Sequence, residues 1–259
     1  MKPLRLLAIA GTSLLAGLMS CTKGLQDGAP VNSTLSTPSA NGTMTIQSLL
    51  FDGSASLGSS AVWKDINIEG SGTVTTINDE TNTLCWKFLK PSGSHRTEGH
   101  GAKNYQAVVG DEIYIGWTCK LYMPTTLQTD AVFQWKSYPT DTFANHPLML
   151  RTKNGNLELQ HFDENHTATV PWSIPLSTST WQSFVLRMKM SKDGTVGYIE
   201  LWYNGTKQTF TNGSQRLYCR TYDSNYCDPK WGVYGGDASQ VTNIVKNIKI
   251  ASTYADAAQ

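Results

Sequence analysis

Residues 112–123 read Glu-Ile-Tyr-Ile-Gly-Trp-Thr-Cys-Lys-Leu-Tyr-Met, in which apolar and polar side chains alternate. One face of an extended chain would carry Ile113, Ile115, Trp117, Cys119 and Leu121, and the other Tyr114, Thr118, Lys120 and Tyr122. A period of two is typical of a strand buried on one face. This stretch therefore predicts a half-buried strand.

Similar runs follow on both sides of this strand. Residues 182–190 and 196–203 alternate in the same way and are separated by the turn Lys192-Asp193-Gly194, while Asn204-Gly205 predicts a tight reversal into residues 206–210. Further strands are expected at 45–51, 83–89, 131–138, 147–152, 156–161, 228–235 and 244–251. So many strands with almost no helix predict an all-β, concanavalin-like jelly-roll sandwich of two antiparallel sheets, with a concave groove.

The composition fits one full-sized domain, which we place at residues 44–259. The chain has 259 residues, of which 39% are hydrophobic and 16% charged, and a formal net charge of +1. No basic run suited to phosphates is present, so nucleic acid is not an expected partner. We expect a monomer.

The N-terminus has the pattern of an export signal. Lys2 and Arg5 precede an apolar run from Leu6 to Met19 that is too short to span a membrane. The stretch Leu18-Met19-Ser20-Cys21 resembles a bacterial lipobox, which predicts acylation of Cys21 and favours it over plain secretion. Residues 22–43 are rich in Ser, Thr, Gly and Pro and predict a flexible tether. We expect an outer-membrane or cell-surface lipoprotein, or a periplasmic protein, that reaches the membrane only through its lipid.

The remaining cysteines are Cys85, Cys119, Cys219 and Cys227, in a chain expected to be exported. Of the three possible pairings, Cys219 with Cys227 closes the shortest plausible loop, and we predict this disulfide. A metal site is not expected, because the chain shows neither a CxxC spacing nor clustered histidines. No cofactor is required, although a structural calcium ion is left open.

Three segments place reactive side chains on strand faces opposite apolar ones. In residues 131–138, Phe133 and Trp135 point inward, which turns Gln134 and Lys136 outward. By the same parity, residues 228–235 turn Lys230 and Tyr234 outward, and an extended segment 94–100 would do so for Arg96, Glu98 and His100. These three segments, far apart in the sequence, would bring their outward groups to one groove.

These segments resemble the signatures of the jelly-roll polysaccharide lyases, a group that includes alginate, glucuronan and heparin lyases. Arg96-Thr97-Glu98, Gln134-Trp135-Lys136 and Lys230-Trp231-Gly232-Val233-Tyr234 occur in the order of the family motifs Arg-Ser/Thr-Glu, Gln-x-His and Tyr-Phe-Lys-Ala-Gly-x-Tyr. The resemblance spans about 140 residues. It implies β-elimination on a uronate of the glucuronan or alginate type, with an anionic polysaccharide as the partner.

The resemblance also implies roles for individual residues. Arg96 and Gln134 would hold the uronate carboxylate and stabilise an enolate-like intermediate, and Tyr234 would supply acid catalysis. The family histidine is replaced by Lys136, so Tyr234 would serve as base and acid if proton and leaving group share a face, as in mannuronate and glucuronate. His100, His146 and Lys136 are the alternative bases. The predicted substrate contacts are Lys230, Glu98, His146 and Tyr114.

Other interpretations remain open at this stage. Arg96 and Glu98 could form a surface ion pair. The side chains of Gln134, Lys136 and Lys230 could occupy solvated strand positions, and the Tyr234 ring could have only a packing role. A glycoside hydrolase is disfavoured because its Glu-x-Asp-x-x-Glu motif is absent. The stronger alternative is a noncatalytic carbohydrate-binding surface lipoprotein on the same fold, since loss of the family histidine could abolish activity and leave the groove intact.

Overall fold

Antiparallel strands account for most of the described chain. The computed structural model describes residues 48–124, 129–138 and 146–258, so the predicted signal, its Cys21 and the whole predicted tether lie outside the described residues. The strands are β1 (Leu49–Asp52), β2 (Trp63–Glu69), β3 (Thr73–Asn78), β4 (Leu84–Lys90), β5 (Arg96–Ala102), β6 (Glu112–Tyr122), β7 (Asp130–Ser137), β8 (Leu148–Lys153), β9 (Asn156–Phe162), β10 (Ala168–Pro175), β11 (Trp181–Lys189), β12 (Tyr198–Tyr203), β13 (Thr206–Lys207), β14 (Leu217–Tyr218), β15 (Cys227–Gly235) and β16 (Val241–Ala251).

In the part of the chain that the structure describes, helical structure is limited to single turns. The described helices are η1 (Ala55–Leu57), α1 (Ser59–Val62) and α2 (Tyr254–Ala257). Within the described ranges, no helix has the length and apolar character needed to span a membrane.

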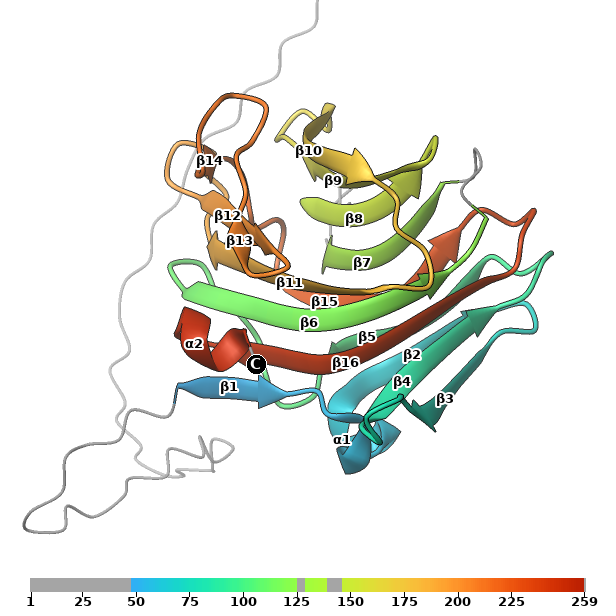
Figure 1. The fold of residues 1–259 in the computed structure, drawn as a ribbon. Helices are drawn as coiled ribbons and strands as arrows, with labels where there is room; N and C mark the ends of the chain where they lie inside the picture. Colours follow the sequence, from blue (N-terminus) through green and yellow to red (C-terminus); the bar gives the residue numbers. More distant parts are fainter. Residues whose placement is uncertain (1–47, 125–128, 139–145, 259) are drawn as a thin grey trace, which may run out of the picture. The chain divides into compact units, whose positions relative to one another are not determined.

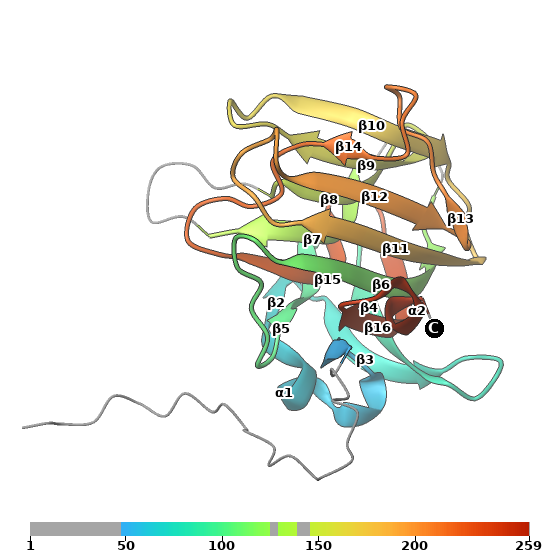
Figure 2. The same cartoon turned by 90° about the vertical axis from the view of Figure 1, so that its left-hand side faces the viewer.

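The strands form two sheets that lie face to face (Figures 1 and 2). A nine-stranded sheet has the order β13-β12-β11-β6-β16-β4-β3, with β1 also paired to β16 and β14 to β12. A seven-stranded sheet has the order β10-β9-β8-β7-β15-β5-β2. All of these pairings are antiparallel, which confirms the predicted sandwich.

The core between the sheets is formed by the apolar positions of the alternating runs. On β6, Ile113, Ile115, Trp117, Cys119 and Leu121 are all buried, as their spacing predicts. The Trp117 ring stacks on Phe133 of the opposite sheet, with 4.6 Å between ring centroids. Burial of such large rings contributes several kcal/mol each. At the hairpin between β12 and β13, Asn204 and Gly205 both have positive φ, the turn geometry that Asn-Gly favours.

The last two long strands of the chain occupy central positions. In the seven-stranded sheet, β15 lies between β7 and β5, and in the nine-stranded sheet β16 lies between β6 and β4. Both strands therefore pair on each side with segments that come much earlier in the sequence. The Figure 1 colours show this as red strands between green and blue-green ones.

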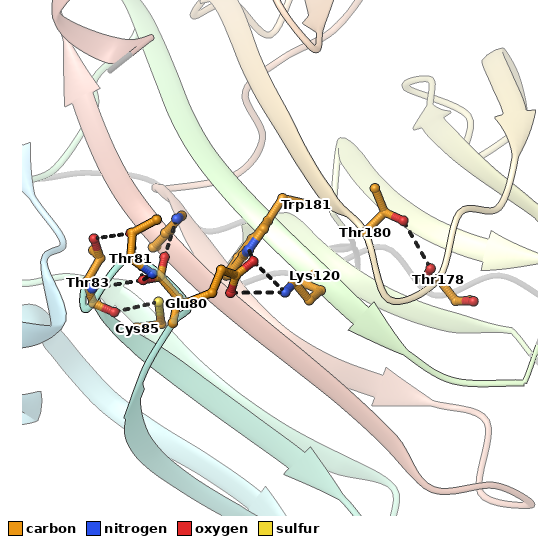
Figure 3. A network of polar contacts seen from close by, with 10 residues as sticks. Glu80, Thr81, Thr83, Cys85, Lys120, Thr178, Thr180 and Trp181 are labelled. Atoms are coloured by element: carbon orange, nitrogen blue, oxygen red, sulfur yellow. Dashed lines mark hydrogen bonds and ion pairs between the residues drawn. The ribbon is translucent and has the colours of Figure 1, made fainter.

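The turn before β4 is fixed to the outer face of the nine-stranded sheet by ion pairs (Figure 3). Glu80 accepts from Lys120 at 3.0 Å and from the Trp181 indole at 2.6 Å, and Lys246 is paired with Asp79. The Trp181 ring also lies 4.7 Å from the Lys120 ammonium and 4.3 Å from that of Lys246. Each charged group here has a partner, so this network stabilises the hairpin and leaves no cation available to a ligand.

The structure corrects the predicted disulfide, because Cys219 and Cys227 are both buried free thiols. Cys219 follows β14 beside Gly197, whose carbonyl accepts its backbone N–H at 2.9 Å. Cys227 begins β15 in the opposite sheet, with its sulfur 3.9 Å from the Asp223 carbonyl. Cys85 and Cys119 are also free and buried. A short loop between two cysteines in sequence therefore does not by itself join their sulfurs.

Candidate active site

A cleft of about 670 Å³ lies on the outer face of the seven-stranded sheet, over β2, β5, β15 and β7. It is lined by Asp65, Ile66, Asn67, Ile68, Glu69, Arg96, His100, Gln134, Lys136, Tyr138, His146, Lys230 and Tyr234. Seven of the predicted site residues are therefore in one cleft. Among the described residues, no group of three or more His, Cys, Asp or Glu side chains is placed to hold a metal ion.

The cleft forms because the three predicted segments are adjacent strands. Lys230 of β15 pairs with Gln134 of β7 on one side and with His100 of β5 on the other. Tyr234 pairs with Arg96. Side chains two residues apart on a strand share a face, so these polar groups point away from the core that holds Trp135 and Trp231.

Gly232 gives β15 the shape that this arrangement needs. Between Trp231 and Tyr234, β15 advances three residues while β7 advances two, from Phe133 to Ala131. Gly232 has φ of 145°, and a Cβ atom there would lie 2.2 Å from the Thr97 carbonyl oxygen. Only glycine fits this β-bulge, which brings β15 close to β5.

Glu98 lies beneath the floor of the cleft and joins three of the lining residues. Its carboxylate accepts a hydrogen bond from the Gln134 amide nitrogen at 2.5 Å. Arg96 Nε is 3.3 Å and Lys230 Nζ 3.6 Å from the other carboxylate oxygen. Burial raises the pKa of the Glu98 carboxyl, whereas Lys230 and Gln134 lower it. Glu98 does not line the cleft and instead positions the residues that do. The structure thus gives it a different role from the substrate contact that the sequence predicted.

The two lysines differ in how firmly they are held. Lys230 is buried and donates to the Asn67 side-chain oxygen at 2.8 Å, and burial lowers the pKa of its amine. Lys136 is half-buried and donates to the Ser137 carbonyl at 3.1 Å. Burial lowers the pKa of Lys136, and the cations Lys230 and Arg96 lower it further. Lys136 is therefore the more accessible cation of the two.

Tyr234 lies against Arg96 at the end of the cleft nearest Glu69. The guanidinium carbon of Arg96 is 4.5 Å from the centre of the Tyr234 ring, and Arg96 also pairs with Glu69 at 2.9 Å. The His95 ring meets the Tyr234 ring edge-on, at 4.9 Å between centroids. These contacts hold the phenol between a cation and an imidazole.

The two histidines of the cleft have different surroundings. His100 Nε2 is 3.7 Å from a carboxylate oxygen of buried Asp228, which also binds Lys64 at 2.8 Å. His146 is buried beside Phe162. Burial, with a smaller contribution from Lys136, lowers the pKa of His146 to about 3. His146 is therefore a neutral imidazole at ordinary pH.

Tyr114 does not belong to the cleft. It lies on β6 in the other sheet, where its ring contacts Trp202 at 6.3 Å between centroids. The prediction that Tyr114 contacts the substrate is therefore wrong. Alternation along a strand shows which side chains share a face, but it does not show which sheet the strand joins.

The sequence prediction missed the wall formed by β2 and the ring of Tyr138. Asp65-Ile66-Asn67-Ile68-Glu69 alternates in the same way as the predicted strands and places its three polar residues along the cleft. That alternation could have identified β2 as a strand. Tyr138 follows Lys136 by two positions, so the alternation that turned Gln134 and Lys136 outward could also have identified it; its ring stacks on His100 at 5.0 Å between ring centroids.

Residues 35–258 match the family described as "Polysaccharide lyase", and the chain belongs to this family. Among solved structures, the fold is similar to an endo-β-1,4-glucuronan lyase from the fungus Trichoderma reesei, with TM-score 0.59 and 17% identity over 75% of this chain and 93% of that one. No curated protein sequence matches the chain.

Two further structures show how widely this fold is shared. The PL-14 alginate lyase from Aplysia kurodai has TM-score 0.52 and 11% identity, covering 80% of this chain and 97% of the other. The catalytic domain of a glycoside hydrolase family 131 protein from Coprinopsis cinerea has TM-score 0.54 and 14% identity, covering 80% and 95%. At these identities the likeness shows the fold alone, so chemistry has to be argued from the cleft.

Proposed function

We propose that this protein cleaves a uronate-containing polysaccharide, of the glucuronan or alginate type, by β-elimination. The observation that carries the proposal is the placement of Arg96, Gln134 and Tyr234 in one cleft. Arg96 and Gln134 both contact Glu98, so a cation and an amide are held on either side of one buried carboxylate. Membership of the polysaccharide lyase family supports the same reaction class.

In the proposed reaction, Arg96 and Gln134 bind the carboxylate of the sugar that loses its C5 proton. Neutralising that carboxylate stabilises the charge that develops when the C5–H bond breaks. The electron pair then forms the C4–C5 double bond, the C4–O4 bond breaks, and O4 takes up a proton. No step uses a cofactor, and repeating the assay with a chelator checks for a structural calcium ion.

Tyr234 is the proposed proton-transfer residue and acts as both base and acid. This requires the C5 proton and the O4 leaving group to lie on the same face of the ring, which favours mannuronate or glucuronate over guluronate. Lys136, in the place of the family histidine, would bind a substrate carboxylate as a cation. His146 is less suited to binding an anion because it stays neutral.

The test is ultraviolet absorbance of the unsaturated uronate during incubation with alginate blocks, glucuronan and heparin. New absorbance on at least one of them is expected. Measurable binding without new absorbance on any of them would instead support the noncatalytic carbohydrate-binding alternative, which the replacement of the family histidine by Lys136 favours.

We also propose that residues 1–21 direct export and that Cys21 carries the lipid, since Leu18-Met19-Ser20-Cys21 resembles a lipobox. Labelling cells with a radioactive fatty acid should mark the wild-type protein. A Cys21→Ser variant should remain unlabelled, and a labelled variant would contradict the assignment.

A further inference from the structure

Asn243 is a polar residue in the row of β16 side chains that faces the core. Its neighbours in that row, Val241 and Val245, are apolar and fully buried, and Asn243 itself is 1% exposed. An amide buried without partners would cost several kcal/mol. Its hydrogen bonds therefore show what it does in the fold.

The Asn243 amide crosses from the nine-stranded sheet to the seven-stranded one. Its nitrogen donates to the carbonyl oxygen of Gly232 at 2.8 Å and to that of Val132 at 3.2 Å. One side chain thus binds two neighbouring strands, β15 and β7, from beneath. Two carbonyl acceptors also settle the orientation of the amide, because only its nitrogen can donate.

Both carbonyls belong to irregular positions of the strand ladders. The register of β15 against β7 shifts between Trp231 and Tyr234, and that of β7 against β8 shifts between Ala131 and Phe133. A bulge leaves a residue outside the ladder, so its backbone groups need another partner. Asn243 supplies that partner for both strands.

The two bulges are adjacent to the cleft residues. Val132 precedes Gln134 by two positions, and Gly232 lies between Lys230 and Tyr234. A rotation of either bulge would move the attached side chains relative to one another. Positional changes of about 1 Å at a reacting centre can lower rates by roughly a hundredfold.

We propose that Asn243 is a positioning residue that couples the two bulges and so sets the placement of Gln134 relative to Tyr234. The inference rests on the proposed function only for its kinetic readout. Its structural part concerns the two strands and holds for any ligand of the cleft.

The test compares Asn243→Leu with Gln182→Leu. Gln182 is a matched control, because it is also 1% exposed and its side chain also makes two hydrogen bonds, to the Ser177 carbonyl and from the Tyr203 hydroxyl. It lies on β11 of the same nine-stranded sheet, but its hydrogen-bond partners belong to neither β7 nor β15. Both variants should unfold at lower temperature than wild type. Only Asn243→Leu should lower kcat, by roughly tenfold to a hundredfold, with a smaller change in KM.

Hydrogen exchange of the backbone gives a readout that needs no activity. Peptides covering 131–135 and 231–235 should exchange faster in Asn243→Leu and at the wild-type rate in Gln182→Leu. If wild type shows no lyase activity but the exchange pattern holds, the proposed function fails and the coupling stands. If the wild type is active, equal kcat per folded molecule in Asn243→Leu and Gln182→Leu overturns the coupling, and unchanged exchange at both bulges overturns it in either case.

Discussion

The side-chain amide of Gln134 lies 2.5 Å from the carboxylate of Glu98, and this short contact ties the amide of the cleft to a buried negative charge. The same carboxylate lies close to Arg96 and Lys230. Three groups that point into the cleft are thus held by one group beneath it. Substitutions at Glu98 should therefore disturb the cleft although Glu98 itself is buried and does not line it.

Replacing Glu98 by Gln should reduce both stability and activity. The substitution leaves buried Lys230 and half-buried Arg96 without their shared anion, and the loss of charged hydrogen bonds costs about 1.5–3 kcal/mol. Urea unfolding and kcat measure the two effects. Glu69→Gln is the control, because Glu69 pairs with the same Arg96 from an exposed position, where such pairs contribute less than about 1 kcal/mol. Equal losses in the two variants would contradict the role of burial.

Tyr234→Phe should lower kcat by roughly 10²–10⁴-fold, the range typical of a lost proton-transfer group. The ring remains, so its contact with Arg96 and the folding of the domain should be preserved. Tyr114→Phe removes a hydroxyl from the opposite sheet and should leave the rate at the wild-type level. Full lyase activity in Tyr234→Phe would show that another residue transfers the proton.

Lys136→Arg should keep kcat within a few-fold of wild type, because arginine preserves the charge but does not deprotonate. In the wild type the pKa of Lys136 is lowered from 10.5, so as the pH rises this amine loses its charge earlier than an ordinary lysine does. KM should therefore increase on the alkaline side in wild type and stay flatter in Lys136→Arg. A loss of kcat of a hundredfold or more in Lys136→Arg would instead identify Lys136 as the base.

His146 should make the protein less stable in acid. The pKa of His146 is about 3 when folded and 6.5 in its ordinary state, so between these values the unfolded chain binds a proton that the folded chain does not. The free energy of unfolding then falls as the pH falls from 6.5 towards 3, by up to about 1.4 kcal/mol per pH unit. Urea unfolding of wild type and His146→Gln at pH 7, 5 and 4 should show a shallower decline in the variant. Parallel curves would exclude this contribution.

Much of the sandwich follows from local alternation. β6 and β11 were predicted because their apolar residues repeat every two positions, and the outward parity of Gln134, Lys136 and Lys230 was correct for the same reason. β2 was missed although Asp65 to Glu69 alternates, and it supplies one wall of the cleft.

Features that depend on distant contacts were not predictable in this way. Loop length suggested a bond between Cys219 and Cys227, but it carries no information about whether the two sulfurs meet, and both thiols are free. The amide of Asn243 could be read as an irregularity in an apolar row, whereas its two carbonyl partners come from strands that are far away in the sequence.

The central placement of β15 and β16 has a consequence for how the protein is made. Leu49 of β1 pairs with Ala251 of β16, so the first strand of the domain can pair only after the last strand has been synthesised. Neither sheet can close on a ribosome until almost the whole domain has been synthesised, and folds dominated by such distant pairings form slowly. The growing chain therefore completes its set of strand pairs only near the end of synthesis.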